Sequence, residues 1–371
     1  MALVEKVTRR LGYRPGAGKL ADQVLFVSFG GKQVSDSPLD IYRELVASGS
    51  NLKLIWAVRS EEQNIPVGAT KVVVGTSEWF TALAKSKYLV SNNNLPMYFR
   101  KSPGQIYLQT WHGTPLKKIG TDIKKNLLTP LYNLAMKREA GFWDYLISPN
   151  EFSSEIFPRA FEFRGRLLET GYPRNDRLTS GHASTRETVR EQLGVSNKET
   201  VVLYAPTWRD DAVDEKGGWA TVNKLEATSF PKGIRILYRG HTNTLGSERN
   251  LDSQVIDVTT YPDVTDLYLA ADVLVTDYSS VMFDFSVTGK PMLFLCPDLD
   301  NYEGTRGFYF DFAKSAPGPI LKSSKEVAVA LQNLDKISRD YREKYTKWRS
   351  KFNRLEDGKA ASRVVAAVFH A

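Results

Sequence analysis

Short apolar runs alternate with longer mixed segments along the whole chain. Buried strands of a parallel sheet read as continuous apolar runs, and the crossover helices between them read as mixed segments. The pattern therefore predicts an α/β fold with two consecutive doubly wound parallel sheets, which would leave a cleft between their strand ends. The predicted strands are residues 24–29, 52–58, 71–74, 88–90, 106–110, 145–147 and 167–169 in the first half and 201–204, 234–238, 255–258, 273–276 and 292–295 in the second, with helices at 38–46 and 279–287 among those between them.

A polar segment, residues 181–200, separates the two halves of this pattern. We place the junction near residues 171–176, just before that segment. This boundary gives one domain of residues 1–172 and a second of residues 173–371. Lys and Arg are frequent from residue 322 onward, and we expect a helical C-terminal tail there, attached to the second domain.

The amino-acid composition indicates which classes of molecule the protein can bind. The net charge is +8 and the pI is about 9.2, a balance that favours an anionic partner such as a phosphate substrate, an acidic lipid or a nucleic acid. Nucleic acid ranks last, because no RNA-binding signature and no zinc-ligand spacing occurs. Cys296 is the only cysteine, so no internal disulfide forms, which fits a reducing compartment. No signal-peptide core and no run of roughly 18 apolar residues occurs in the sequence.

His112 is the first candidate for chemistry. It follows the predicted strand 106–110 and precedes the turn Gly113-Thr114-Pro115, and it is one of only four histidines. Open α/β sheets place their chemistry at the ends of strands, and histidine exchanges a proton near neutral pH. His112 is therefore a candidate general base. The alternative is a histidine that only hydrogen-bonds the turn.

Three strand ends in the second half carry groups suited to phosphate. Hydroxyl groups and a helix N-terminus both donate hydrogen bonds to phosphate oxygens. Cationic side chains next to a glycine suit a pyrophosphate. The alternatives are an ordinary helix cap and solvated turns. The candidate residues are Thr207, Arg209, Arg239, His241, Ser279 and Ser280.

Candidates for a second substrate lie in the first half. Gly30 and Gly31 follow the first strand and permit a tight turn with close approach of a ligand. Asn93 lies in an asparagine run after another strand and could bind hydroxyls, although asparagine is also common in turns. Lys117 lies close to His112 and is a candidate for an acceptor phosphate.

Residues 116–143 combine basic side chains with leucines spaced three and four apart, which is typical of an amphipathic helix. Such a helix either lies on an anionic membrane surface or packs on the core with its lysines in solvent. The candidate membrane contacts are Lys124, Lys125, Leu127, Leu131, Lys137 and Arg138.

Taken together, these strings resemble the CDP-glycerol glycerophosphotransferase family, the primases and polymerases of teichoic acid synthesis. The resemblance runs in order from about residue 24 to residue 320. It is carried by residues 28–32 (Ser-Phe-Gly-Gly-Lys), 35–38 (Ser-Asp-Ser-Pro), 111–117 (Trp-His-Gly-Thr-Pro-Leu-Lys), 205–209 (Ala-Pro-Thr-Trp-Arg), 239–241 (Arg-Gly-His), 276–280 (Thr-Asp-Tyr-Ser-Ser) and 306–311 (Arg-Gly-Phe-Tyr-Phe-Asp).

The resemblance implies a GT-B fold of two Rossmann-like domains, with the acceptor on the first and the nucleotide donor on the second. It implies that His112 is the base, and that Arg209, His241, Ser279 and Ser280 surround the donor pyrophosphate. It further implies transfer of glycerol phosphate from CDP-glycerol to a polyprenyl-diphosphate-linked saccharide or polymer, with release of CMP, at the cytoplasmic face of the membrane.

Several alternatives stay open. The donor could be CDP-ribitol or a nucleotide sugar, and a membrane-surface binding module without turnover is possible, although the presence of both His112 and His241 argues against it. The chain is close in size to the compact primase type, which puts processive polymerisation in doubt. We expect no cofactor and no protein-held metal, because Asp277 and Asp284, the nearby acidic residues, are expected to be structural. The acceptor and the oligomeric state are left open.

Overall fold

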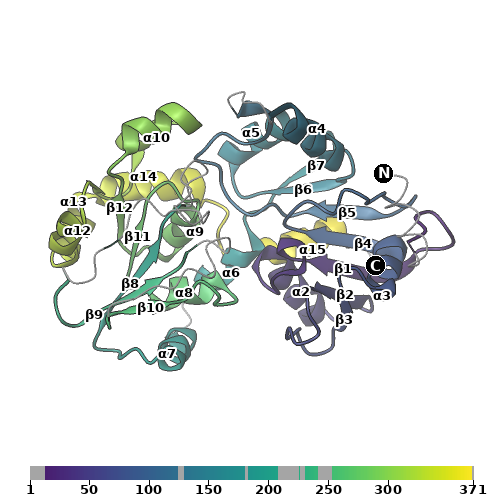
Figure 1. Ribbon diagram of the computed structural model, residues 1–371, viewed down its shortest axis with the longest axis horizontal. Coiled ribbons are helices and arrows are strands. Elements are labelled where there is room, and N and C mark those ends of the chain that lie inside the picture. Colours follow the sequence, from purple (N-terminus) through teal and green to yellow (C-terminus); the bar gives the residue numbers. More distant parts are fainter. Residues whose placement is uncertain are drawn as a thin grey trace, which may run out of the picture. The chain divides into compact units, whose positions relative to one another are not determined.

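The computed structural model describes residues 13–123, 129–179, 183–207, 225, 230–240 and 253–369 (Figure 1). The chain forms two compact units, each built on a parallel sheet with helices. The first unit comprises Met1–His112, Ile119–Asp176 and Leu355–Ala371, and the second comprises Gly113–Lys118 and Arg177–Arg354.

The first unit contains a seven-stranded sheet in the order β3-β2-β1-β4-β5-β6-β7, and all its pairings are parallel. The order reverses between β1 and β4, which makes their carboxyl ends the topological switch point, the usual ligand position of such sheets. All seven strands match predicted runs. They are β1 (Ala21–Val27), β2 (Lys53–Val58), β3 (Thr70–Val73), β4 (Ser86–Ser91), β5 (Ile106–Gln109), β6 (Tyr145–Ser148) and β7 (Arg166–Glu169).

Helices of the first unit begin where side chains can satisfy their free N–H groups. The Thr76 hydroxyl accepts from the Trp79 amide at the start of α3, and the Asn150 side chain accepts from the Ser153 amide at the start of α5. The helices are α2 (Asp36–Ala47), α3 (Ser77–Lys85), α4 (Thr129–Ala140), α5 (Glu151–Phe161) and α15 (Ala360–Val368), with short 3-10 turns at Phe29–Gly31, Gly120–Asp122 and Pro173–Asn175. Helix α6 (Asp176–Thr179) begins at the last residue of this unit and continues into the part of the chain that belongs to the second.

The second unit contains a six-stranded parallel sheet in the order β10-β9-β8-β11-β12-β13, with its switch point between β8 and β11. Its strands are β8 (Thr200–Ala205), β9 (Ile234–Tyr238), β10 (Val255–Asp257), β11 (Val273–Thr276), β12 (Met292–Leu295) and β13 (Ile320–Leu321). Its helices are α7 (Ala183–Gln192), α8 (Val264–Ala270), α9 (Val281–Phe285), α10 (Leu299–Arg306), α11 (Phe312–Ser315), α12 (Ser324–Leu331), α13 (Leu334–Asp340) and α14 (Arg342–Phe352), with a 3-10 turn at Ser286–Thr288.

The C-terminal segment departs from the predicted domain division. Helices α12–α14 belong to the second unit as expected, but α15 belongs to the first (Figure 1, yellow helix beside α2). Val364 and Val368 join the core that α2 forms with β1 and β2. Asp176 accepts hydrogen bonds from the first two amides of α15, and Arg363 donates to the Thr170 carbonyl. The apolar face of α15 therefore packs on the first sheet, which is formed by the N-terminal part of the chain.

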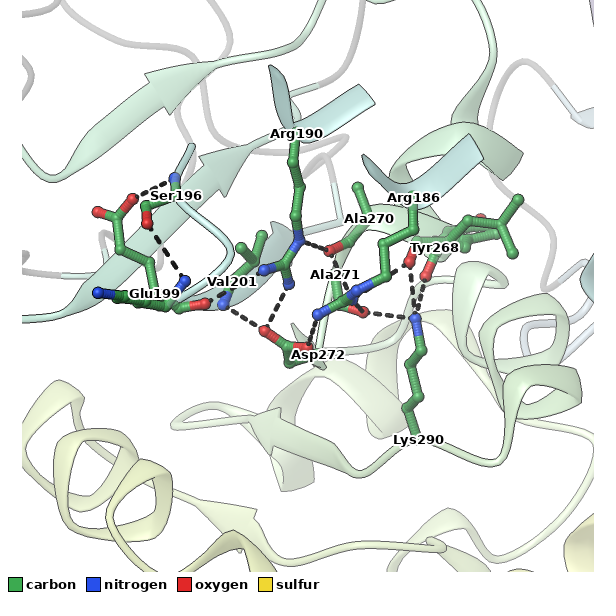
Figure 2. A network of polar contacts seen from close by, with 12 residues as sticks. Arg186, Arg190, Ser196, Glu199, Val201, Tyr268, Ala270, Ala271, Asp272 and Lys290 are labelled. Atoms are coloured by element: carbon green, nitrogen blue, oxygen red, sulfur yellow. Dashed lines mark hydrogen bonds and ion pairs between the residues drawn. The ribbon is translucent and has the colours of Figure 1, made fainter. Parts of the chain in front are cut away.

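At the amino edge of the second sheet, cations hold the C-terminal carbonyls of α8 (Figure 2). Lys290 Nζ donates to the carbonyls of Tyr268, Leu269 and Ala271 at 2.6–3.0 Å. Arg190 donates to the Ala270 carbonyl at 2.9 Å, and both Arg186 and Arg190 pair with Asp272. Positive charge at a helix C-terminus is stabilising. Burial, with the neighbouring Arg186, lowers the pKa of Lys290 to about 8.

We predict that Val364→Ala lowers the free energy of unfolding by about 2 kcal/mol, because it removes two buried methyl groups and leaves a cavity. Val364 is 0% exposed. Chemical denaturation followed by circular dichroism measures the effect. The control is Val329→Ala on α12, where the side chain is 61% exposed and a change near zero is expected. Equal effects for the two variants would contradict the placement of α15.

Candidate functional site

The first candidate site lies at the switch point of the first sheet. Phe29 follows β1, Asn92 follows β4 and His112 follows β5, and these strands are neighbours in the sheet. The Asn92 side-chain oxygen accepts from the Phe29 amide at 2.7 Å, so the loops after β1 and β4 are joined. His112 is half-buried, stacks on Trp111 with ring centroids 4.4 Å apart, and lies 6.1 Å from the Phe29 ring.

The hydrogen bond of His112 fixes its tautomer. His112 Nδ1 lies 2.6 Å from the main-chain carbonyl of Asn92. A carbonyl oxygen only accepts, so Nδ1 carries the proton and the neutral ring has its lone pair on Nε2. We assign the tautomer from this partner. The arrangement leaves Nε2 able to take a proton from a substrate.

The charge state of His112 is set by burial and by one ion pair. Burial lowers the pKa of His112 below its ordinary value, the Asn92 carbonyl and Asp36 raise it, and Arg174 lowers it. Asp36 and Arg174 form a buried ion pair at 3.0 Å, so their effects on the ring oppose each other. Because burial is the largest cause, His112 is neutral at pH 7 and its Nε2 is a base.

Backbone strain gathers at this switch point. Phe29 (φ 46°), Asp36 (φ 64°) and Trp111 (φ 53°) are three of the four non-glycine residues with positive φ in the part of the chain that the structure describes. Such conformations cost free energy and persist where the surrounding contacts fix them, often at functional sites. All three belong to segments that position either His112 or the ion pair between Asp36 and Arg174.

The predicted acceptor-side residues Gly30, Gly31 and Asn93 make different kinds of contact. A Cβ on Gly31 would lie 3.0 Å from Val74 Cγ2, so this glycine permits close packing of the loop. The Gly30 carbonyl accepts from Arg59 at 2.7 Å. Asn93 is exposed, and its side chain accepts from the next amide within the turn. Asn92 is the asparagine beside His112. In the sequence, Asn92 stood out only as the first asparagine of the run that follows the predicted strand 88–90.

The second candidate site lies at the switch point of the second sheet. The Thr276 hydroxyl donates to the Ala205 carbonyl at 2.7 Å. Asp277 Oδ1 accepts from the amides of Thr207 and Tyr278 at 2.8 and 2.6 Å. Asp277 therefore joins the ends of β8 and β11, as expected for a structural carboxylate, and brings Thr207 to the segment that leads into Ser279.

Ser279 and Ser280 are half-buried residues between β11 and α9. The helix that follows them is five residues long, shorter than predicted, and continues as a 3-10 turn. Ser280 is its first flanking residue, but its side chain makes no capping hydrogen bond. An ordinary serine cap therefore does not account for Ser280.

Lys117, the predicted acceptor-side residue, belongs to the second unit, and its role as an acceptor contact stays a prediction. The segment Gly113–Lys118 is part of that unit, and a Cβ on Gly113 would lie 2.9 Å from Ser280 Oγ. The Lys118 amide donates to the Gly307 carbonyl, and the Tyr309 amide donates to the Leu116 carbonyl. The motifs 111–117 and 306–311, which are far apart in the sequence, are thus joined by an antiparallel β-bridge between Lys117 and Phe308.

Arg239 has a structural role in the geometry. Its Nη1 donates to the carbonyls of Val258 and Tyr261 at 3.0 and 2.9 Å, and burial lowers its pKa. It holds the loop after β10. Arg209 and His241 lie outside the described residues.

Helix α4 carries the described part of the predicted membrane contact. Leu131 and Leu134, one turn apart, are 69% and 65% exposed. Lys137 pairs with Glu162 at 2.6 Å. Arg138 donates to the Phe99 carbonyl and lies over the Phe142 ring, so it is held by the protein. Lys124, Lys125 and Leu127 lie outside the described residues.

Two absences hold for the described residues. Among them, no group of three His, Cys, Asp or Glu side chains is placed to hold a metal ion. None of their helices is long and apolar enough to cross a membrane.

Comparison with known proteins places the chain in a family. The model of CDP-Glycerol:Poly(glycerophosphate) glycerophosphotransferase matches residues 15–370. The chain is 39% identical over 364 residues to the teichoic acid glycerol-phosphate transferase of Staphylococcus aureus, covering 93% of this chain and 92% of that one. It is 36% identical over 380 residues to a teichoic acid poly(glycerol phosphate) polymerase of Bacillus spizizenii, covering 97% and 94%.

Solved structures agree with the sequence comparison. The wall teichoic acid polymerase TagF, in a variant soaked with CDPG, matches with a TM-score of 0.91 at 34% identity, covering 99% of this chain and 94% of that one. The chain spans about half the length, 49% and 48%, of two longer polymerases, from Staphylococcus epidermidis and Bacillus subtilis. The chain belongs to the CDP-glycerol:poly(glycerophosphate) glycerophosphotransferase family.

Proposed function

We propose that this protein transfers glycerol phosphate from CDP-glycerol to a hydroxyl of a lipid-linked acceptor in teichoic acid synthesis and releases CMP. The observation that carries the proposal is the His112 ring, whose Nδ1 is committed to the Asn92 carbonyl, in a chain of this family. A base with a free Nε2 at a sheet switch point suits activation of a hydroxyl.

We assign the two substrates to different units. The acceptor hydroxyl binds at the first sheet, beside His112, and the nucleotide donor binds at the second, where Thr207, Ser279 and Ser280 surround the switch point. Two Rossmann-like sheets used in this way correspond to the GT-B plan. We also assign Arg209 and His241 to the donor pyrophosphate, as the resemblance to the family implies, and Arg239 supports the site by holding the loop after β10.

The reaction follows from these assignments. His112 Nε2 removes the proton of the acceptor hydroxyl, and the oxygen attacks the phosphorus that bears glycerol. The bond between that phosphorus and the bridging oxygen breaks, and CMP leaves with the electron pair. Negative charge grows on the phosphoryl oxygens, so the hydroxyls of Ser279 and Ser280 with Arg209 and His241 stabilise it. No cofactor takes part.

The number of units added is not tied to chain length. The Bacillus spizizenii relative named a polymerase is matched over 94% of its own length, so a compact chain is compatible with polymerisation. This removes the size argument against it. We propose that the acceptor is either a primed lipid-linked saccharide or a growing glycerol-phosphate chain.

Membrane contact through α4 is part of the proposal, because the acceptor is lipid-anchored. Leu131 and Leu134 present apolar side chains to solvent on one helix face, with Lys137 one turn further on. An interfacial helix inserts such leucines and keeps its lysines at the headgroups. Docking on the inner face of the plasma membrane supplies the acceptor. No nucleic acid is involved.

We predict that purified protein releases CMP from CDP-glycerol with a synthetic lipid-linked disaccharide acceptor, and much less product from CDP-ribitol or UDP-sugars. Chromatography of the released nucleotide measures turnover for each donor. The control is His112→Ala, for which we expect a loss of roughly 10²–10⁴ in rate while CDP-glycerol binding by calorimetry is retained. Unchanged turnover in His112→Ala, or preference for another donor, would refute the proposal.

We predict that the acid limb of the kcat/KM profile lies below about pH 6.5, because burial lowers the pKa of His112. Asp36 raises that pKa, so Asp36→Asn moves the limb to still lower pH. Asparagine tolerates the positive φ at this position. Asp22→Asn, on an exposed carboxylate at the start of β1, is the control and leaves the profile unchanged. A shift to higher pH in Asp36→Asn would contradict the assignment.

We predict that the double change Leu131→Gln and Leu134→Gln weakens binding to phosphatidylglycerol vesicles about tenfold, because two apolar side chains no longer insert. Vesicle co-sedimentation measures binding. The control changes Val46 and Val67, which are also exposed but lie away from α4, to Gln. Equal losses in both pairs would show that α4 is not the contact.

A further inference from the structure

A cavity of about 450 Å³ lies in the second unit, at the edge opposite the proposed donor site. Its lining includes Gly289 and Met292, where β12 begins, together with residues of α13 and α14. Ser279 and Ser280 follow the end of β11, which runs parallel to β12. The cavity is therefore at the amino edge of the sheet, whereas the donor site is at the carboxyl edge.

The wall that α14 contributes is fixed to the sheet. Tyr345 donates its hydroxyl hydrogen bond to the Lys290 carbonyl at 2.7 Å, and Trp348 donates to the Ser286 hydroxyl at 3.2 Å. The Lys290 ammonium is itself anchored to the carbonyls of α8 (Figure 2). The loop and the helix are thus held in place without a ligand, and a preformed cavity lowers the entropic cost of binding.

Two arginines of the cavity are available to an anion. Arg342 and Arg349 line it from one face of α14, two helical turns apart, or roughly 10 Å along the axis. Both are exposed, and within the described residues neither guanidinium makes an ion pair or a hydrogen bond. Thr346 lies between them on the lining, and its hydroxyl donates to the Arg342 carbonyl at 2.9 Å, which leaves its oxygen able to accept a hydrogen bond.

The surroundings favour a polyanion over a membrane. Residues 322–354 carry ten Lys or Arg and four Asp or Glu, a net charge of +6 out of +8 for the chain. Among the described residues of this segment, Val329 is the one strongly exposed large apolar side chain. Membrane-docking helices pair positive charge with protruding apolar side chains, and this surface has only the charge.

We propose that this cavity binds a chain of phosphodiesters joined by short carbon spacers, which under the proposed function is the glycerol-phosphate polymer, at a site distinct from the transfer site. Guanidinium groups recognise phosphate, and their separation suits charges divided by carbon spacers better than the adjacent charges of a diphosphate. The Thr346 oxygen can accept a hydrogen bond from a glycerol hydroxyl, and the partly exposed Pro291 and Ile337 offer apolar contact to the spacer carbons. The identity of the ligand rests on the proposed function.

The test is calorimetry of the full chain with a synthetic glycerol-phosphate hexamer at low salt. We expect the double change Arg342→Gln and Arg349→Gln to weaken hexamer binding about tenfold or more, since each arginine loses charged hydrogen bonds. The control removes the same charge from the same basic segment outside the cavity, with Lys325→Gln and Lys336→Gln. It should weaken binding by less than about threefold, the effect of a screened surface field. Unfolding midpoints verify that all variants fold.

Several results would overturn the proposal. They are equal losses in the two pairs of variants, full hexamer binding by the arginine pair, and wild-type binding to the hexamer no tighter than to CDP. Loss of phosphatidylglycerol vesicle binding with hexamer binding retained would assign the arginines to lipid instead. Transfer from CDP-glycerol to a short acceptor is measured in parallel and should be unchanged in the arginine pair. Absence of transfer in the wild type would refute the proposed function, while the calorimetry still reports on the cavity.

Discussion

The hydrogen bond from His112 Nδ1 to the Asn92 carbonyl is the interaction on which the proposed chemistry depends. It forms because β4 and β5 are parallel neighbours, so the segments that follow both strands emerge at the same edge of the sheet. Asn92 directly follows β4, and His112 is the third residue after β5. A side-chain acceptor would leave the tautomer open to change with protonation, whereas a main-chain carbonyl cannot donate. The sheet topology therefore decides which nitrogen of His112 is the base.

The same edge of the sheet also contains the contacts that stabilise the strained backbone around His112. Trp111 has a positive φ, and its indole stacks on the imidazole while its amide donates to the Gln109 side chain. The buried pair of Asp36 and Arg174 holds the start of α2 and the turn at Pro173–Asn175 together. Breaking such a pair leaves an uncompensated charge, so the pair specifies this one arrangement even if it adds little net stability. The rigidity needed to orient His112 is thus built from strained and charged elements.

The hydrophobic pattern predicted the strands well, because parallel strands buried on both faces must be apolar throughout. It missed β13, whose two residues are too short to stand out. It also assigned α15 to the wrong unit, because an apolar stripe indicates burial but not the sheet that covers it. The candidate residues could be placed at strand ends, and His112, Thr207 and Ser279 do follow strands in the structure. The sequence could not show that Asn92 lies beside His112, or that Lys117 pairs with Phe308, because these contacts join segments remote in sequence.

Charge was the least informative part of the sequence until its partners were known. Arg174, Arg186, Arg190, Arg239 and Lys290 are all engaged by carboxylates or main-chain carbonyls, so they stabilise the fold and contribute little to recognition. A cation already saturated by internal acceptors must lose those bonds before it can bind a phosphate, and that loss offsets the gain. The basic residues that can recognise an anion are those whose donors face solvent or a cavity. In the described part of the second unit, Arg342 and Arg349 meet that condition on one concave surface. The excess of positive charge thus becomes evidence about a partner only after the structural cations have been set aside.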